Sequence, residues 1–119
     1  MSIIVKTKNP NTLVAKIKEY IDEKKIDTWI YDSDGDFTHN VVQWEFHAWL
    51  RPIVLDENTI IFGIIGRNDK KMSVVEYAVY HGRFIEMLLS HFDKQCQSME
   101  ATPLPTKHDD LGKEVSNEG

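Results

Sequence analysis

Apolar positions recur along most of the chain in short runs, whose spacing alternates between that of a strand and that of a helix. Ile3–Thr7 is rich in β-branched residues and predicts a first strand. Asn9 and Pro10 have the pattern of an N-cap followed by a proline at the first helical position. Apolar residues at helical spacing continue as far as Ile21, so we expect a helix that ends near Lys24.

Four further strands are predicted in the middle of the chain, with no helix between them. Thr28–Tyr31 and Phe37–His39 flank an Asp-Ser-Asp-Gly-Asp sequence, whose Asp-Gly pair is a strong hairpin signal. Trp49–Leu55 and Thr59–Ile65 are two longer apolar runs on either side of a polar turn. Consecutive strands joined by short turns indicate antiparallel pairing.

A second helix is predicted from Val74 to about Lys94, where Ser73 and Glu76 form a capping box. Its expected buried stripe comprises Val74, Ala78, His81, Ile85, Leu88 and Phe92. Further apolar residues flank this stripe, so the apolar surface is wider than in an ordinary surface helix. The element order β-α-β-β-β-β-α predicts an α+β fold, with a mainly antiparallel sheet of about five strands and helices packed mainly on one face.

Composition divides the chain near residue 97. With 119 residues, of which 41% are hydrophobic, the chain is long enough for one core. We therefore expect residues 1–96 to form a single α+β domain. Residues 97–119 are poor in large apolar groups and contain Pro103 and Pro105, so a disordered acidic tail is expected there.

Charge and hydropathy exclude several classes of partner. The formal net charge is −5, and five acidic residues stand against two lysines between Glu100 and Gly119. The remaining charges are nearly balanced, which argues against duplex nucleic acid. No apolar run approaches the roughly 20 residues of a membrane span, and no secretory signal begins the sequence. The lone thiol of Cys96 suits a reducing compartment, so a cytoplasmic location is expected.

One acidic cluster could carry chemistry. Asp32, Asp34, Asp36 and His39 could hold a hard cation or activate water, which would suit a small metal-assisted hydrolase. The spacing does not fit a calcium-binding loop, however, because that loop needs glycine at its sixth position and glutamate at its twelfth. Carboxylates at a hairpin tip more often satisfy turn backbone. We therefore expect a solvated turn and no metal.

A second candidate is the sequence His81-Gly82-Arg83 in the predicted helix. Glycine inside a helix costs about 1 kcal/mol relative to alanine, so Gly82 is expected to let another backbone or a ligand approach closely. His81 is either a buried, hydrogen-bonded histidine or a group that binds a ligand or transfers a proton. Arg83 is expected on another face of the helix.

Aromatic residues near arginines form a third candidate. Trp44 and Trp49, together with Arg51 and Arg67, could line a pocket for a small anionic, nucleotide-like ligand. Core packing of the tryptophans and an internal ion pair for Arg51 are the alternatives. No dinucleotide-binding or phosphate-loop motif occurs in the sequence, so no cofactor is expected.

Thr59–Ile65 has apolar residues on both of its faces, and this feature favours one of the functional hypotheses. Two helices cover one face of a sheet, so a second copy or a protein partner is expected to cover the other. A lid formed by Asn40–Phe46 is the alternative cover. The leading hypothesis is a non-catalytic, self-associating cytosolic binding module, for which a regulatory or immunity-type role is one interpretation. A metal-assisted hydrolase and an anionic-ligand binding protein are the alternatives.

Overall fold

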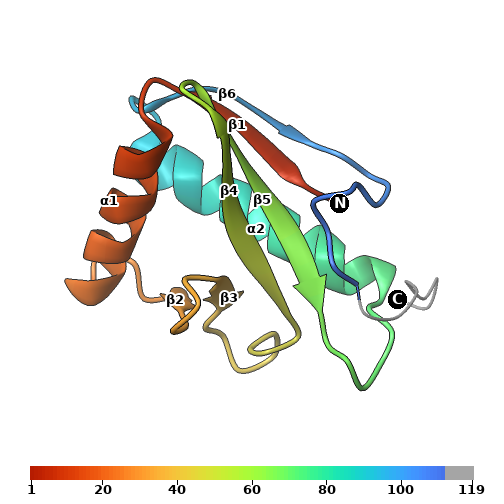
Figure 1. Cartoon of the computed structure of the whole chain (residues 1–119). Coiled ribbons are helices and arrows are strands. Elements are labelled where there is room, and N and C mark those ends of the chain that lie inside the picture. Colours follow the sequence, from red (N-terminus) through yellow and green to blue (C-terminus); the bar gives the residue numbers. More distant parts are fainter. Residues whose placement is uncertain (112–119) are drawn as a thin grey trace.

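The computed structural model describes residues 1–111, which form an antiparallel sheet and two helices (Figure 1). The elements are β1 (Ile3–Thr7), α1 (Pro10–Asp22), β2 (Trp29–Tyr31), β3 (Phe37–His39), β4 (Ala48–Asp56), β5 (Thr59–Gly66), α2 (Val74–Phe92) and β6 (Cys96–Ala101). The predicted α+β class and antiparallel sheet are confirmed. The sheet of the described residues has six strands, one more than expected, because β6 follows α2.

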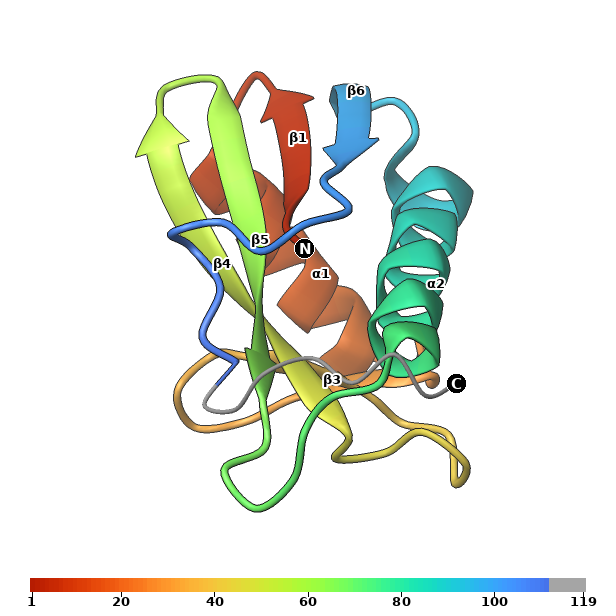
Figure 2. The same ribbon diagram turned by 90° about the vertical axis from the view of Figure 1, so that its right-hand side faces the viewer.

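The strands lie in the order β2-β3-β4-β5-β1-β6, so the first strand of the chain lies between β5 and the last strand. Every neighbouring pair is antiparallel. Both helices cover the same face of the sheet, as Figures 1 and 2 show. We call this the inner face and the opposite one the outer face.

Both helices begin at capping residues that can be identified in the sequence. The side chain of Asn9 accepts a hydrogen bond from the Thr12 amide at 3.1 Å, which caps α1. Ser73 Oγ accepts from the Glu76 amide at 3.0 Å, and Glu76 Oε1 accepts from the Ser73 amide at 2.9 Å. The predicted capping box of α2 is therefore confirmed.

The core lies between the inner face and the two helices. Ile60, Phe62 and Ile64 of β5 are fully buried there against aromatic side chains that include Tyr80 and Phe84. Burying each such side chain stabilises the fold by about 1.5–3 kcal/mol.

The buried stripe of α2 differs from the predicted one. Tyr80, Phe84 and Met87 point inward together with His81, Leu88 and Phe92, and the exposed Ala78 points outward. Aromatic rings bury more area than alanine does, so the helix is rotated to enclose Tyr80 and Phe84. This rotation leaves other apolar residues of α2 in contact with solvent.

The prediction of disorder from Gln97 is wrong for the described part of that segment. Residues 96–101 form the edge strand β6, in which Glu100 is paired with Ile4 and Met99 with Val5 of β1. Backbone hydrogen bonds to β1 form this polar strand, and they require no apolar periodicity. Residues 112–119 of the predicted tail lie outside the described residues.

Residues 102–111 then cross the outer face of the sheet in front of β5 (Figure 2). The amide of Asp110 donates to the Ile64 carbonyl at 2.9 Å, and Gly66 donates to the Asp110 carbonyl at 2.8 Å. At Gly63 the crossing is so close that a Cβ atom would lie 2.0 Å from the His108 carbonyl oxygen. The chain itself therefore covers much of the outer face of β5.

Candidate functional site

The acidic turn between β2 and β3 is held by its own backbone. Asp32 Oδ1 accepts hydrogen bonds from the amides of Asp34 and Asp36, each at 3.0 Å. The carboxylate of Asp36, a buried residue, accepts from Arg51 Nε at 3.2 Å and from Arg51 Nη2 at 3.1 Å. Although ligand atoms of the three aspartates lie within 4.8 Å of one another, His39 does not belong to this group. The four residues of the proposed hydrolase cluster are thus not assembled.

The arginines of the expected anionic-ligand site are each paired with a carboxylate of the chain. Hydrogen bonds from Arg51 to Asp36 raise the pKa of Arg51. Arg67 donates to Asp69 at 2.8 and 2.5 Å, which raises its pKa as well. Trp49 and Arg67 line the same open depression of about 420 Å³, and Arg51 is not part of its lining. An anion at this place would compete with ion pairs that already exist.

His81 is a buried side chain with both ring nitrogens engaged. Nδ1 contacts the Tyr77 carbonyl at 2.6 Å, and Nε2 contacts the Met1 carbonyl. Burial lowers the pKa of His81 and outweighs these two contacts, which favour protonation. The geometry therefore agrees with the expected buried, hydrogen-bonded histidine.

Trp44 lies in the loop before β4 and packs against the edge of the core. Its carbonyl accepts a hydrogen bond from the Tyr80 hydroxyl of α2. Close by, His47 Nδ1 and Glu76 Oε2 are 2.5 Å apart. The loop is thereby tied to α2 on the inner side. It does not form the lid over β5 that was the alternative to self-association, and residues 102–111 lie there instead.

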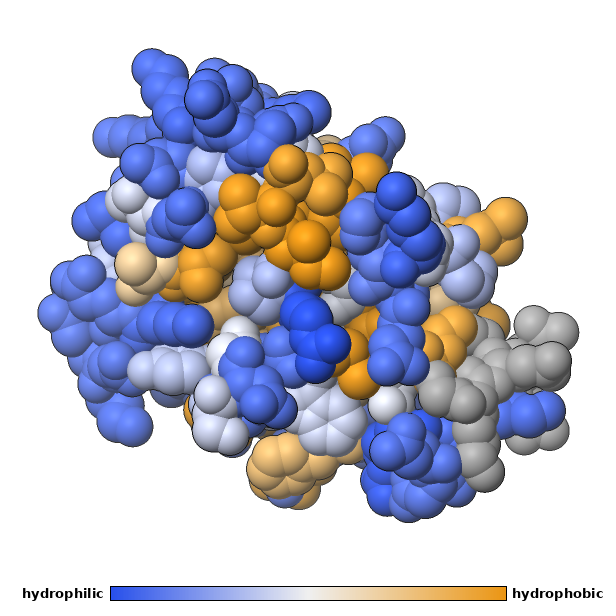
Figure 3. Space-filling model, in the orientation of Figure 1, coloured by the Kyte–Doolittle hydropathy of each residue, from blue (hydrophilic) through white to orange (hydrophobic). Residues whose placement is uncertain are grey.

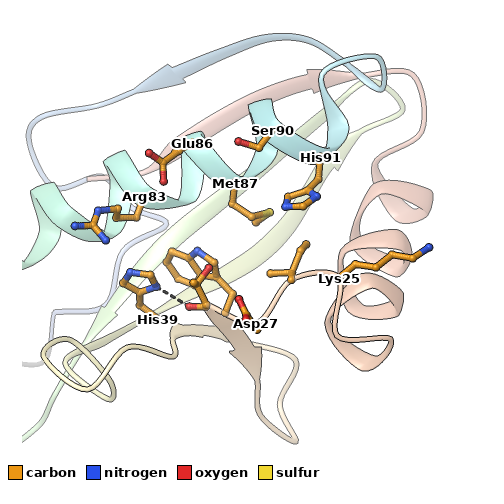
Figure 4. A pocket seen from close by; sticks show the side chains of 11 residues that line it. Lys25, Asp27, His39, Arg83, Glu86, Met87, Ser90 and His91 are labelled. Atoms are coloured by element: carbon orange, nitrogen blue, oxygen red, sulfur yellow. Dashed lines mark hydrogen bonds between the residues drawn. The ribbon is translucent and has the colours of Figure 1, made fainter.

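A polar cavity of about 250 Å³ lies between the β2–β3 ribbon and α2. Arg83, Glu86, Ser90 and His91 line it from α2, along the side of the helix that faces His39 (Figure 4). Of the expected ligand-binding residues, only Arg83 lines this cavity; Trp44, Trp49, Arg51, Arg67 and His81 lie elsewhere.

His39 is the most unusual residue of this cavity. The side chain is 2% exposed, and its ring stacks on Trp29 with 4.6 Å between the ring centres. Nδ1 lies 2.7 Å from the Thr28 carbonyl, which can only accept, so Nδ1 carries the proton. Burial lowers the pKa of His39, and the charge of Arg83 lowers it further. Nε2 is thus an unprotonated acceptor, and it has no hydrogen-bond partner among the described residues.

Sequence reasoning singled out His39 and Arg83 but did not bring them together. The missed residues are Lys25 and Asp27 before β2, and Glu86 on α2. The spacing of Arg83 and Glu86, three residues apart on one side of the helix, was the available signal. Their relation to His39 arises only from the packing of α2 against the ribbon.

Two apolar surfaces remain exposed. On the outer face, the half-buried Ile4 and Ile53 flank the buried Ile61, and Leu55 beyond Ile53 is 49% exposed. Figure 3 shows apolar atoms gathered over this part of β1, β4 and β5. The second surface runs along the outside of α2 and comprises the exposed Val75, Ala78, Gly82 and Leu89 and the half-buried Ile85, which also packs against the core. We call these five residues the α2 seam.

Comparison of the chain with protein-family models, curated proteins and solved structures finds no match. Within residues 1–111, no helix combines the length and the hydrophobicity needed to cross a membrane. The cavity at His39 and the two apolar surfaces are therefore the features from which a function can be inferred.

Proposed function

We propose that the protein is a non-catalytic cytosolic binding module that associates with a second copy of itself through the α2 seam. The observation that carries this proposal is the apolar character of the helix face that points to solvent. Val75 is 40% and Leu89 55% exposed, and Ala78 and Gly82 between them are also exposed. A helix with one wet face normally carries polar residues there.

Gly82 lies at the centre of the seam, and the space beside it is open among the described residues. A Cβ atom at this position would meet no described atom within 4 Å. Glycine in a helix costs about 1 kcal/mol relative to alanine, so a residue with a side chain would stabilise the monomer. Close approach of a second backbone is the advantage that glycine offers here.

The spacing of the seam suits antiparallel pairing with itself. Its residues follow one another at intervals of three, four, three and four, which is the spacing of a coiled-coil seam. A twofold axis at Gly82 places Val75 of one copy opposite Leu89 of the other, and Ala78 next to Ile85. Val75 and Leu89 then meet each other and Gly82 meets its own copy, whereas Ala78 lies directly opposite Glu86, one residue from Ile85.

Charge at the two ends of the seam supports the same arrangement. Lys71 lies just before the start of α2, and Asp93 caps its end. The twofold axis at Gly82 brings Lys71 of one copy close to Asp93 of the other. Antiparallel helix dipoles also place each positive helix end near a negative one. A second copy is therefore a better occupant than an unrelated apolar helix.

The expected affinity is modest. One face of a single helix buries less than the roughly 800 Å² per partner of a standard interface. Small interfaces of this kind belong to weak or transient complexes. We therefore expect a monomer–dimer equilibrium with a Kd in the micromolar range.

Sedimentation equilibrium tests the proposal, with charged substitutions on each apolar surface. Leu89→Lys is expected to yield a monomer at concentrations where the wild-type protein dimerises, because it buries a charge in the seam. Leu55→Lys on β4 is the matched control, since Leu55 is similarly exposed on the other surface. A wild-type monomer at several hundred micromolar would refute the proposal. So would a dimer that Leu55→Lys disrupts and Leu89→Lys does not.

A further inference from the structure

The buried Nε2 of His39 is an acceptor that the described residues leave unpaired. An unsatisfied buried polar atom costs about 1–3 kcal/mol, and native structures retain few of them. The bond from Nδ1–H to Thr28 fixes both the tautomer and the direction of the ring. Packing on Trp29 and against Tyr80 holds the ring in place. The lone pair of Nε2 is therefore presented in one fixed position.

The charges around this nitrogen are of both signs. Arg83 and Glu86 are close enough to act in opposite directions on the pKa of His39. Lys25 and Asp27 add one further charge of each sign to the lining. Figure 4 shows Arg83 and Glu86 on α2 across from His39 and Asp27. A cavity with balanced charges suits a ligand that carries both charges, in preference to a simple anion or cation.

The volume of the cavity and the unpaired acceptor at His39 Nε2 further limit the class of ligand. The volume of about 250 Å³ lies below the range of roughly 300–1,000 Å³ for drug-sized ligands. Nε2 needs a hydrogen-bond donor, and the guanidinium of Arg83 can pair with a carboxylate. An ammonium group supplies the donor and can also pair with Glu86.

We propose that this cavity binds a small zwitterion of the α-amino-acid class. Its ammonium group donates to His39 Nε2 and pairs with Glu86, and its carboxylate binds Arg83. Nε2 has less than 1 Å² of exposed surface, so neighbouring side chains have to shift when the ligand enters. Interface side chains commonly change rotamer on binding. Arg83 and Glu86 also border the α2 seam, beside Gly82, but this proposal does not depend on self-association.

Nuclear magnetic resonance of protein with ¹⁵N-labelled histidine tests the site directly. Each of the twenty α-amino acids is added separately at millimolar concentration, with propionate and propylamine as probes that carry one charge each. We expect one amino acid, or a small chemically related group, to move the Nε2 resonance of His39. Neither single-charge probe is expected to move it at the same concentration.

Substitutions on the exposed side of α2 test the roles of the charges without disturbing the core. Arg83→Met is expected to weaken binding roughly tenfold to a hundredfold, as for loss of a charge-assisted hydrogen bond. Glu86→Gln is expected to weaken it less, because the amide still accepts a hydrogen bond. Arg67→Met is the control for loss of a positive charge and is expected to bind as the wild type does.

Three results would overturn the assignment. One is that no amino acid moves the His39 resonance, which would mean that an ordered water alone satisfies Nε2. Another is that propionate binds as well as any amino acid, because the site would then be a simple anion site. The third is unchanged affinity in Arg83→Met.

Discussion

The outer face of β5 and the outer face of α2 are both apolar, but the chain covers only the first. At Gly63 residues 102–111 pass so close to the strand that a side chain has no room. At Gly82 the space around the helix is open among the described residues. One glycine is therefore explained by a contact within the monomer, and the other is not. The difference indicates that an exposed apolar face is evidence for a partner only where no other segment of the same chain packs against it.

The comparison is tested first by a substitution that detaches residues 102–111 from β5. The carboxylate of Asp109, 1% exposed, accepts hydrogen bonds from the Ile64 amide, the Thr106 amide and the Ser2 hydroxyl. Asp109→Ala leaves these donors buried and unpaired, so we expect the free energy of unfolding to fall by about 3 kcal/mol. Urea denaturation measures the change. Glu100→Ala, on the exposed side of β6, is the control and should change it by less than about 0.5 kcal/mol.

Gly63→Ala tests the close crossing itself. The added methyl group would lie 2.0 Å from the His108 carbonyl oxygen, so the crossing segment has to move away. Overpacking of this kind costs about 1–3 kcal/mol. Denaturant melts measure the loss, and stability equal to that of the wild type would show that residues 102–111 do not press on β5.

Acidification is expected to destabilise the protein below neutral pH. Burial lowers the pKa of both His39 and His81, so the unfolded chain binds protons at a higher pH than the folded chain does. The stability that these histidines contribute is complete above their ordinary pKa of about 6.5 and is lost as the pH falls from there through their lower folded values. Thermal melts between pH 7.5 and 5 measure this loss. A melting temperature that rises as the pH is lowered from 7.5 to 5 would contradict this prediction.

The smallest expected effect on stability is that of replacing Gly82. Gly82→Ala should raise the free energy of unfolding of the monomer by about 0.8 kcal/mol, because alanine is the better helix former and no described atom obstructs it. The same methyl group should weaken the dimer, since it separates the two backbones. Chemical denaturation at low concentration measures the first effect and sedimentation the second. A loss of monomer stability would mean that Gly82 has a structural role.

Much of the fold could be predicted from short-range signals. The caps at Asn9 and Ser73 and the Asp-Gly hairpin act within a few residues, and each is found where the sequence indicates. Strand β6 was missed because an edge strand needs only backbone partners, and its polar residues carry no periodic pattern. Crossing of β5 by residues 102–111 depends on long-range contacts with Ile64 and Ser2, which no local pattern encodes.

The candidate site was only partly predictable for a similar reason. His39 attracted notice because of the acidic turn that precedes it, yet its ring points to the cavity beside α2. Arg83 and Glu86 come from a helix more than forty residues further along the chain. The orientation of α2 decides which of its side chains reach His39, and that orientation follows from the burial of Tyr80 and Phe84.

The central claim, antiparallel self-association at Gly82, is tested most directly by disulfide cross-linking in a Cys96→Ser background. A disulfide requires two Cα atoms about 4.4–6.8 Å apart, so it reports the register of the two helices. A mixture of the Val75→Cys and Leu89→Cys proteins is expected to form a mixed disulfide rapidly under mild oxidation, while either protein alone cross-links slowly. Equally fast cross-linking of Val75→Cys with itself, or no preferred pair at all, would contradict the account.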